Sequence, residues 1–136
     1  MTKVTKTNSL DKVQKHLKAE CFNKLFIGGH FVDPVDGQKM HTCYPATGEV
    51  LHELPKGNVN DIEAAIRAAE AAWLDGAWAN MPASARGDLI SRMAQGIEEN
   101  IEVLAAIEAA DVGKPFRQAE MVLGGAANEG KYWASL

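Results

Sequence analysis

The chain has 136 residues, of which 46% are hydrophobic and 24% charged, and its 14 basic and 18 acidic residues give a net charge of −4. This size and apolar content are ordinary for one domain with a core. No block of like charges favours nucleic acid or a membrane surface, and no apolar run reaches the roughly 18 residues of a membrane-spanning helix. The start lacks the apolar core of a secretory signal, so we expect a cytoplasmic protein.

Residues 1–24 are polar and basic, and we expect them to form a loosely ordered lead-in. A mitochondrial presequence is the disfavoured alternative, because this stretch has no arginine and contains two acids. Ser9 could also cap a short helix, because apolar residues recur there at helical spacing. These residues are Leu10, Val13, Leu17 and Cys21.

A small antiparallel β unit is predicted next. Leu25–Val32 is rich in β-branched and aromatic residues and is interrupted by Gly28-Gly29, which predicts two strands joined by a tight turn. Segments 40–44 and 50–54 flank a second reversal at residues 45–48, where Pro45 fixes one turn dihedral and Gly48 tolerates a positive φ.

Three to four helices are predicted after the β unit. In the first, Asn58 is the N-cap, Asp61 is the third helical residue and Gly76 ends the helix. Its apolar face is formed by Val59, Ile62, Ile66, Ala69 and Trp73.

The bounds of the remaining helices are predicted mainly from proline and glycine residues at their ends. The second begins near Pro82, and the third runs from about Asn100 to Gly113, after which Pro115 prevents continuation. The fourth follows Pro115, but three internal glycines weaken it by about 1 kcal/mol each relative to alanine. These are Gly124, Gly125 and Gly130.

The cysteines and histidines form no recognisable catalytic or metal motif. Cys21 and Cys43 are too few for a zinc site, and we expect Cys43 to lie in a half-buried strand as a small apolar residue. His41 and His52 are expected to face each other across the second hairpin, yet two ligands without a third make a poor metal site.

Five segments stand together in a characteristic order. They are Leu25–Asp33, Pro45–Val50, the alanine-rich Ile62–Trp73, Arg86–Leu89 and Asp111–Pro115. In this order and spacing the chain resembles the amino-terminal portion of the NAD(P)-dependent aldehyde dehydrogenases, over residues 25–136. The resemblance implies an α/β fold for the parent enzyme, of which this segment would supply the small antiparallel β unit and the three to four helices.

The resemblance also implies a function. A parent enzyme of this family would oxidise an aldehyde to a carboxylic acid through a cysteine thiohemiacetal, use NAD or NADP, and form a homodimer or homotetramer. The family's thiolate, base and cofactor site lie later in the chain, so no residue here is assigned a catalytic or cofactor-binding role, and this segment alone is expected to be inactive and to bind no cofactor. The uncapped apolar end at Tyr132–Leu136 leads us to expect a truncation.

One site is implied by the resemblance. Several family members hold a monovalent cation with backbone carbonyls before the first turn motif and with the aspartate of the last motif, which correspond here to Thr42, Cys43 and Asp111. Tyr44 and Val112 stand where the family usually has asparagine. The alternative is that Asp111 makes only a local cap or ion pair near Lys114.

Two other functions stay open. The chain could be a free-standing, non-catalytic helical module that binds a partner, such as an intact homologue, through apolar surface. It could also be an unrelated small enzyme that uses Cys43 with a nearby histidine.

Overall fold

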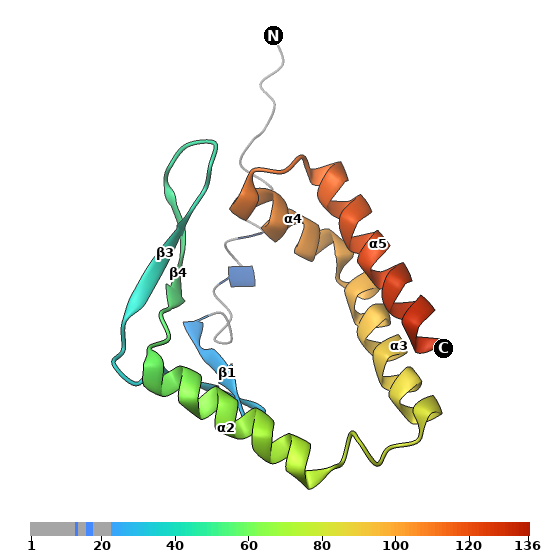
Figure 1. Ribbon diagram of the computed structural model, residues 1–136. Helices are drawn as coiled ribbons and strands as arrows, with labels where there is room; N and C mark the ends of the chain where they lie inside the picture. Colours follow the sequence, from blue (N-terminus) through green and yellow to red (C-terminus); the bar gives the residue numbers. More distant parts are fainter. Residues whose placement is uncertain (1–12, 14–15, 18–22) are drawn as a thin grey trace.

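The computed structural model describes Val13, His16, Leu17 and residues 23–136. The predicted lead-in and its short helix therefore lie almost wholly outside the described residues. Two β-hairpins are followed by four helices in the described part, as the sequence predicted. The elements form an open ring, in which the chain leaves the hairpins along α2, crosses to α3, and returns through α4 to the tip of the second hairpin (Figure 1).

The first hairpin joins β1 (Leu25–Ile27) to β2 (His30–Val32) in antiparallel register. Gly28 and Gly29 have φ of 61° and 82°, and a two-residue turn of this kind needs a positive φ at both central positions. Phe26 and Phe31 are direct cross-strand partners, with ring centroids 5.0 Å apart. The predicted strand–turn–strand is confirmed.

The second hairpin joins β3 (Lys39–Cys43) to β4 (Val50–Pro55) and forms a separate two-stranded sheet. Its register pairs Thr42 with His52 but Cys43 with Val50, so Leu51 is an extra, bulged residue. The bulge shifts the pairing beyond it by one residue. His41 therefore faces Glu53 instead of His52, and the prediction that the two histidines face each other is wrong.

An ion pair on this hairpin gives a pH-dependent prediction. The hydrogen bond from the Lys39 ammonium, 3.2 Å from Oε2, lowers the pKa of Glu53. Because the folded-state pKa is the lower one, the contribution of the pair to stability is present above the unfolded-state pKa of Glu53 and is lost as the pH falls through the folded-state value. Lys39→Met should raise the Glu53 pKa in an NMR carboxyl titration.

Arg67→Met is the matched control for that titration, because Arg67 pairs with a different exposed acid, Glu63, at 3.4 Å. The control should leave the titration of Glu53 unchanged. An unaltered Glu53 pKa after Lys39→Met would show that the ion pair is not maintained in solution.

Helix α2 (Val59–Asp75) begins with a capping box and ends at Gly76, as predicted. The Asn58 side chain accepts from the backbone N–H of Asn60 and Asp61, and Asp61 Oδ2 accepts from the Asn58 N–H at 2.8 Å. Asp61 is buried, and its other oxygen accepts from the Val35 N–H at 3.0 Å. One side chain thus starts α2 and fixes the loop between the hairpins to it.

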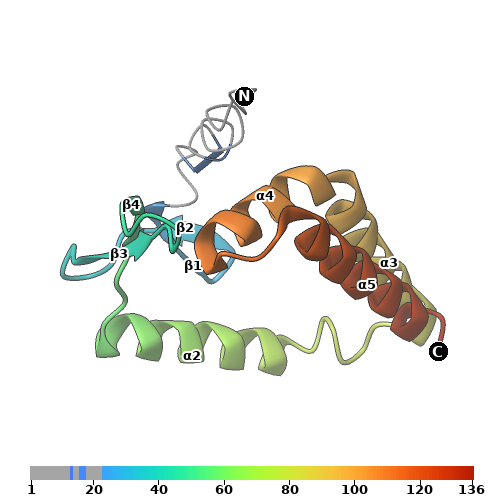
Figure 2. The same ribbon diagram turned by 90° about the horizontal axis from the view of Figure 1, so that it is seen from above.

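Helices α3 (Ala83–Glu99), α4 (Ile101–Val112) and α5 (Phe116–Ala134) form the other side of the ring. The most extensive helix contact is between α3 and α5, which Figures 1 and 2 show side by side. Small residues lie at the contacts among these three helices. The most deeply buried alanines are Ala94, Ala105, Ala119 and Ala127. Among the described residues no helix combines the length and apolar character needed to cross a membrane.

Glycines in this layer permit close packing. A Cβ on Gly87 would lie 2.5 Å from the carbonyl oxygen of Ala134, and a Cβ on Gly130 would lie 3.2 Å from the Cβ of Ala94. Despite its internal glycines, α5 is continuous over 19 residues. Of the three glycines in α5, Gly130 is the one that a neighbour approaches closely, whereas Gly125 has nothing within 4 Å of the position of a Cβ.

Candidate functional site

The tip of the second hairpin is a rigid reversal. The Tyr44 N–H donates to the Glu49 carbonyl at 2.8 Å, and the Gly48 N–H donates back to the Tyr44 carbonyl at 2.8 Å. Gly48 has a φ of 74°, as the turn prediction requires. Thr42 and Cys43 are thereby held at the end of β3, directly before the turn.

The carboxyl end of α4 meets this reversal. Gly113 ends α4, and a Cβ placed on it would lie 3.4 Å from the Cβ of Pro45. In the same region the Thr42 hydroxyl donates to Oδ1 of Asp111, although the two residues are 69 positions apart. The structure therefore brings together Thr42 and Asp111, two of the three residues of the candidate cation site, with Cys43 adjacent to Thr42 in the chain.

A small apolar core supports this junction. It contains Val13, Leu17, Leu51 and Ala110, with Tyr44, Ala106 and Ile107 packed against it. Because of the bulge, Leu51 and His52 together lie opposite Thr42. A bulge of this kind changes the direction in which the side chain of the extra residue points. Leu51 in β4 and Ala110 in α4 thus anchor the strand and the helix that carry the two polar residues.

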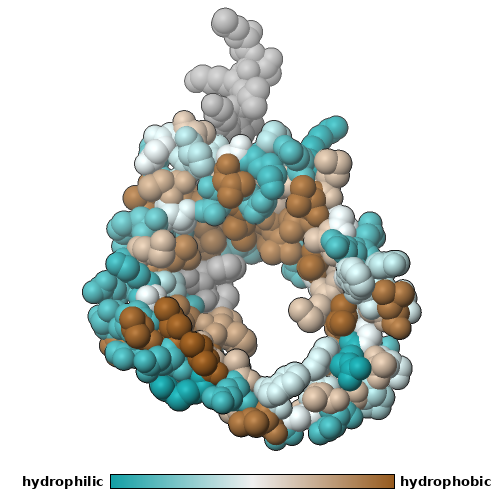
Figure 3. All heavy atoms as spheres, viewed as in Figure 1, coloured by the Kyte–Doolittle hydropathy of each residue, from teal (hydrophilic) through white to brown (hydrophobic). Residues whose placement is uncertain are grey.

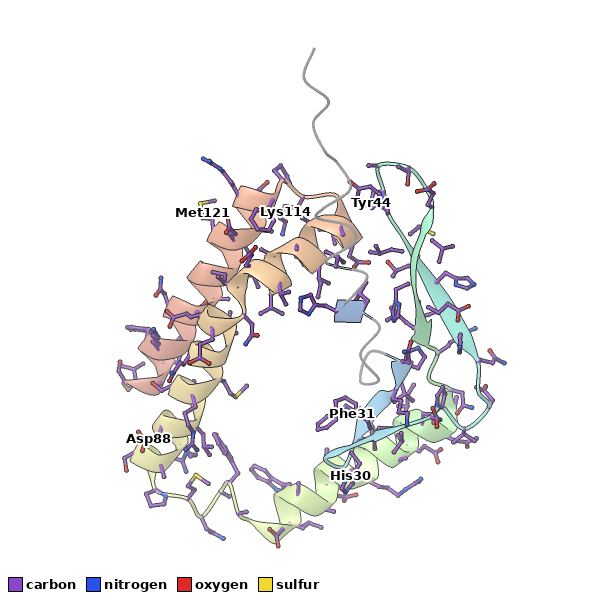
Figure 4. The ribbon with its side chains drawn as sticks, turned by 180° about the vertical axis from the view of Figure 1, so that it is seen from behind. His30, Phe31, Tyr44, Asp88, Lys114 and Met121 are labelled. Atoms are coloured by element: carbon purple, nitrogen blue, oxygen red, sulfur yellow. The ribbon has the colours of Figure 1, made fainter. Side chains whose placement is uncertain are left out.

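The oxygen atoms available where the hairpin tip meets the end of α4 suit a cation. A carboxylate, a hydroxyl and backbone carbonyls are hard oxygen ligands, and the carboxyl end of a helix carries partial negative charge. Lys114 lies 2.6 Å from Glu108, and the Asp111 carboxylate accepts from the Thr42 hydroxyl. Figure 4 shows Lys114 and Tyr44 on the facing elements at this junction.

A pocket of about 300 Å³ opens beside the turn. Its lining is mostly apolar and small, and its polar groups are those of Tyr44 and Lys114. Apart from Val13 in the amino-terminal segment, the remaining lining residues come from the turn, from α4 with its end at Gly113, and from the start of α5. They are Val13, Ala46, Ala106, Ala109, Ala110, Gly113 and Phe116.

The other residues considered from sequence form no second site in the described part. Cys43 lies in a strand as expected but is exposed, so the predicted half-burial is wrong. The His41 Nδ1 is 3.9 Å from Glu53 Oε1, so this ring is directed across to β4. No three His, Cys, Asp or Glu side chains gather as metal ligands anywhere in the described ranges.

The glycine pairs do not form a nucleotide-binding loop. Gly28 and Gly29 make the hairpin turn, and Gly124 and Gly125 lie within α5. A dinucleotide site needs glycines at the first turn of a strand–helix unit, with the phosphates at the helix N-terminus. Neither glycine pair therefore has the arrangement of such a dinucleotide-binding loop.

Comparison with known proteins identifies the family. A family model described as the aldehyde dehydrogenase family matches residues 31–136. Aldehyde dehydrogenase 1 from Tanacetum cinerariifolium is 41% identical over 101 residues, which are 74% of this chain and 20% of that relative. The mitochondrial aldehyde dehydrogenase of Rattus norvegicus is 41% identical over 95 residues, 69% of this chain and 18% of the relative. The chain belongs to the aldehyde dehydrogenase family.

Solved structures confirm the fold. Betaine aldehyde dehydrogenase from Staphylococcus aureus, in complex with NAD+, matches with a TM-score of 0.89 and 27% identity, over 93% of this chain and 25% of that chain. HpcC from Thermus thermophilus matches with a TM-score of 0.85 and 28% identity, over 93% and 24% of the two chains. The fold is that of the amino-terminal part of an aldehyde dehydrogenase, and the chain spans about a fifth of the length of the curated relatives.

Proposed function

We propose that this chain is the amino-terminal portion of an enzyme that oxidises an aldehyde to a carboxylic acid with NAD or NADP. The family match over residues 31–136 carries this proposal. The mechanism would use a cysteine thiolate that adds to the aldehyde carbonyl to form a thiohemiacetal, NAD or NADP would supply the hydride acceptor, and water would then cleave the resulting thioester to release the acid and the thiol. The segment would contribute scaffold and a cation site, while the nucleophile, the base and the cofactor contacts would come from parts of the fold that it does not span.

The test compares the natural gene product with the 136-residue chain. We expect the protein purified from its native source to be several times heavier than 14.7 kDa and to form NADH or NADPH only when an aldehyde is added. The 136-residue chain alone should form none. Reproducible aldehyde oxidation by the short chain, lost in Cys43→Ser, would overturn the proposal in favour of a small cysteine enzyme.

The free-standing module remains the second candidate, because large apolar side chains are exposed along α2 and α5. A native product of 14.7 kDa without activity would favour it. Location in the cytoplasm and assembly of the parent as a homodimer or homotetramer stay predictions, and two of the relatives from plants are named as mitochondrial.

We also propose that Thr42, the backbone carbonyl of Cys43 and Asp111 hold a monovalent cation. The Thr42–Asp111 contact and the oxygen-rich helix end support this site. A cation at about ten times its Kd should raise the free energy of unfolding by about 1.4 kcal/mol. Urea unfolding in potassium or sodium chloride, against tetramethylammonium chloride at equal ionic strength, measures the gain.

Asp111→Asn should abolish that gain, because it removes the negative charge that balances the cation. Asp88→Asn is the matched control, since it makes the same change at an exposed position of α3 and should keep the gain. Equal stability in the three salts for the unaltered protein would contradict the site.

A further inference from the structure

The pocket beside the hairpin turn, of about 300 Å³, has walls of small apolar residues. Its volume is at the lower end of the range of about 300–1,000 Å³ that is usual for ligand pockets. Helix α4 contributes three alanines to the lining and the turn contributes a fourth; they are Ala106, Ala109, Ala110 and Ala46. On the face shown in Figure 3, hydrophobic residues gather over α4. Because alanine side chains are short, this surface suits a flat ring or a short apolar chain.

Lys114 and Tyr44 supply the polar side-chain groups of the pocket. Lys114 is the charged residue of this lining in the described part of the chain, and its side chain is 24% exposed. The Tyr44 phenol adds a hydroxyl group, which is also a hydrogen-bond donor. An ammonium group and a hydroxyl beside apolar walls are the donors that a carboxylate with an apolar body requires.

The Lys114 ammonium already has one carboxylate partner. Its Nζ is 2.6 Å from Oε1 of Glu108, whose side chain is 38% exposed. An ammonium has three N–H donors, so one bond leaves two for a second acceptor. Glu108 is not part of the pocket lining, and we expect it to compete with a bound acid for the same positive charge.

The start of α5 adds partial positive charge at the same place. Phe116 lines the pocket and is the first residue of this 19-residue helix. The N-cap residue, Pro115, makes no side-chain hydrogen bond, and the first turn contains no acidic residue. The N–H groups of this turn therefore favour a nearby anion. Asp111 is not part of the lining, and its carboxylate accepts from the Thr42 hydroxyl.

We propose that this pocket binds a small monocarboxylic acid with an aromatic or short aliphatic body. The body lies against the alanines of α4, and the carboxylate accepts hydrogen bonds from Lys114 and from Tyr44. The proposal goes beyond the proposed function. It involves neither the Thr42–Asp111 pair nor any step of catalysis, and binding is measured without turnover.

The experiment is an NMR titration of the full 136-residue chain with benzoate. The tetramethylammonium salt is used at constant ionic strength, so that no alkali cation enters the candidate cation site. We expect saturable shifts at the amides of Ala109, Gly113 and Phe116, with a Kd of about 1–10 mM for a ligand of this size. Benzyl alcohol, which has the same ring without the charge, should bind at least about fivefold more weakly. Benzylammonium should cause no shift at these amides.

Substitutions in the ion pair test the role of the charge. Lys114→Met should weaken benzoate binding at least about tenfold, and Lys114→Arg should restore the Kd to within about threefold. Glu108→Gln should tighten binding by about threefold, because it removes the competing carboxylate. Lys131→Met is the matched control, since Lys131 forms an equally short ion pair with Glu98 at 2.6 Å outside this pocket. The control should leave the Kd unchanged.

Three results would overturn the binding proposal. The first is the absence of saturable shifts at the pocket amides of the unaltered chain. The second is equal affinity for benzoate and benzyl alcohol, and the third is an unchanged Kd in Lys114→Met. Circular dichroism of Lys114→Met should show unchanged helix content, and recovery of binding in Lys114→Arg separates lost charge from lost folding. Aldehyde oxidation by the parent enzyme, present or absent, bears only on the proposed function.

Discussion

Replacing Asp61 by alanine should lower the free energy of unfolding by about 2–4 kcal/mol. Asp61 is only 4% exposed, and its two oxygens accept from the backbone N–H groups of Val35 and Asn58. Without the carboxylate both N–H groups lose a charged acceptor, and the capping box of α2 loses one of its two halves. The loop after β2 would also lose its hydrogen bond to α2.

Urea unfolding followed by circular dichroism measures this loss, and hydrogen exchange locates it. The amides of Val35 and Asn58 should lose protection before those in the middle of α2. Asp61→Asn should retain part of the stability, because an amide offers one acceptor oxygen where the carboxylate offers two. Glu63→Ala, which removes an exposed acid from the same helix, should change stability by no more than about 0.5 kcal/mol. Similar losses in Asp61→Ala and Glu63→Ala would show that the buried acid is not what joins the loop to the helix.

Local signals in the sequence were sufficient for the secondary structure. Asn58, Asp61 and Gly76 mark the ends of α2 because capping involves residues only a few positions apart. The glycines of both hairpin turns are likewise local signals, because each adopts a positive φ that the turn requires. Each of these elements therefore appears in the structure close to where the sequence predicted it.

Pairing over longer distances was not predictable in the same way. The extra residue at Leu51 shifts the hairpin register, and nothing in the local pattern of β4 indicates a bulge. Cys43 is exposed on a short two-stranded sheet, and the strand pattern alone does not reveal whether an element covers that face. The apolar face predicted for α2 has the spacing of a core face, yet its large side chains are exposed in the described structure.

The candidate cation site depended on resemblance. Thr42 and Asp111 are 69 residues apart, and no spacing rule connects the end of a strand to the end of a helix across three intervening elements. The structure supplies the physical link, since Leu51 and Ala110 pack in one core beside the two polar residues. Ala110 is next to Asp111 in the sequence, and Leu51 lies in the strand that pairs with the strand of Thr42, so this packed hydrophobic pair positions the polar pair.

Gly87→Ala should lower the free energy of unfolding by about 1–2 kcal/mol, although alanine is the better helix former by about 1 kcal/mol. The new Cβ would lie 2.5 Å from the carbonyl oxygen of Ala134, and backbone cannot turn away as a flexible side chain can. Helices α3 and α5 must therefore move apart, which loosens the most extensive helix contact in the described structure.

Glycine-to-alanine substitutions at two other positions complete a series of three, whose free energies of unfolding are measured in urea. Gly96→Ala, also in α3, adds a Cβ with nothing within 4 Å and should stabilise the protein by up to about 1 kcal/mol. Gly130→Ala places its Cβ 3.2 Å from the Ala94 Cβ and should fall between the two. If all three substitutions stabilised the protein equally, helix propensity alone would explain them and the close approach of α3 to α5 would be refuted. The predicted order instead makes the missing side chain at Gly87 the feature that lets the carboxyl end of α5 approach the backbone of α3 closely.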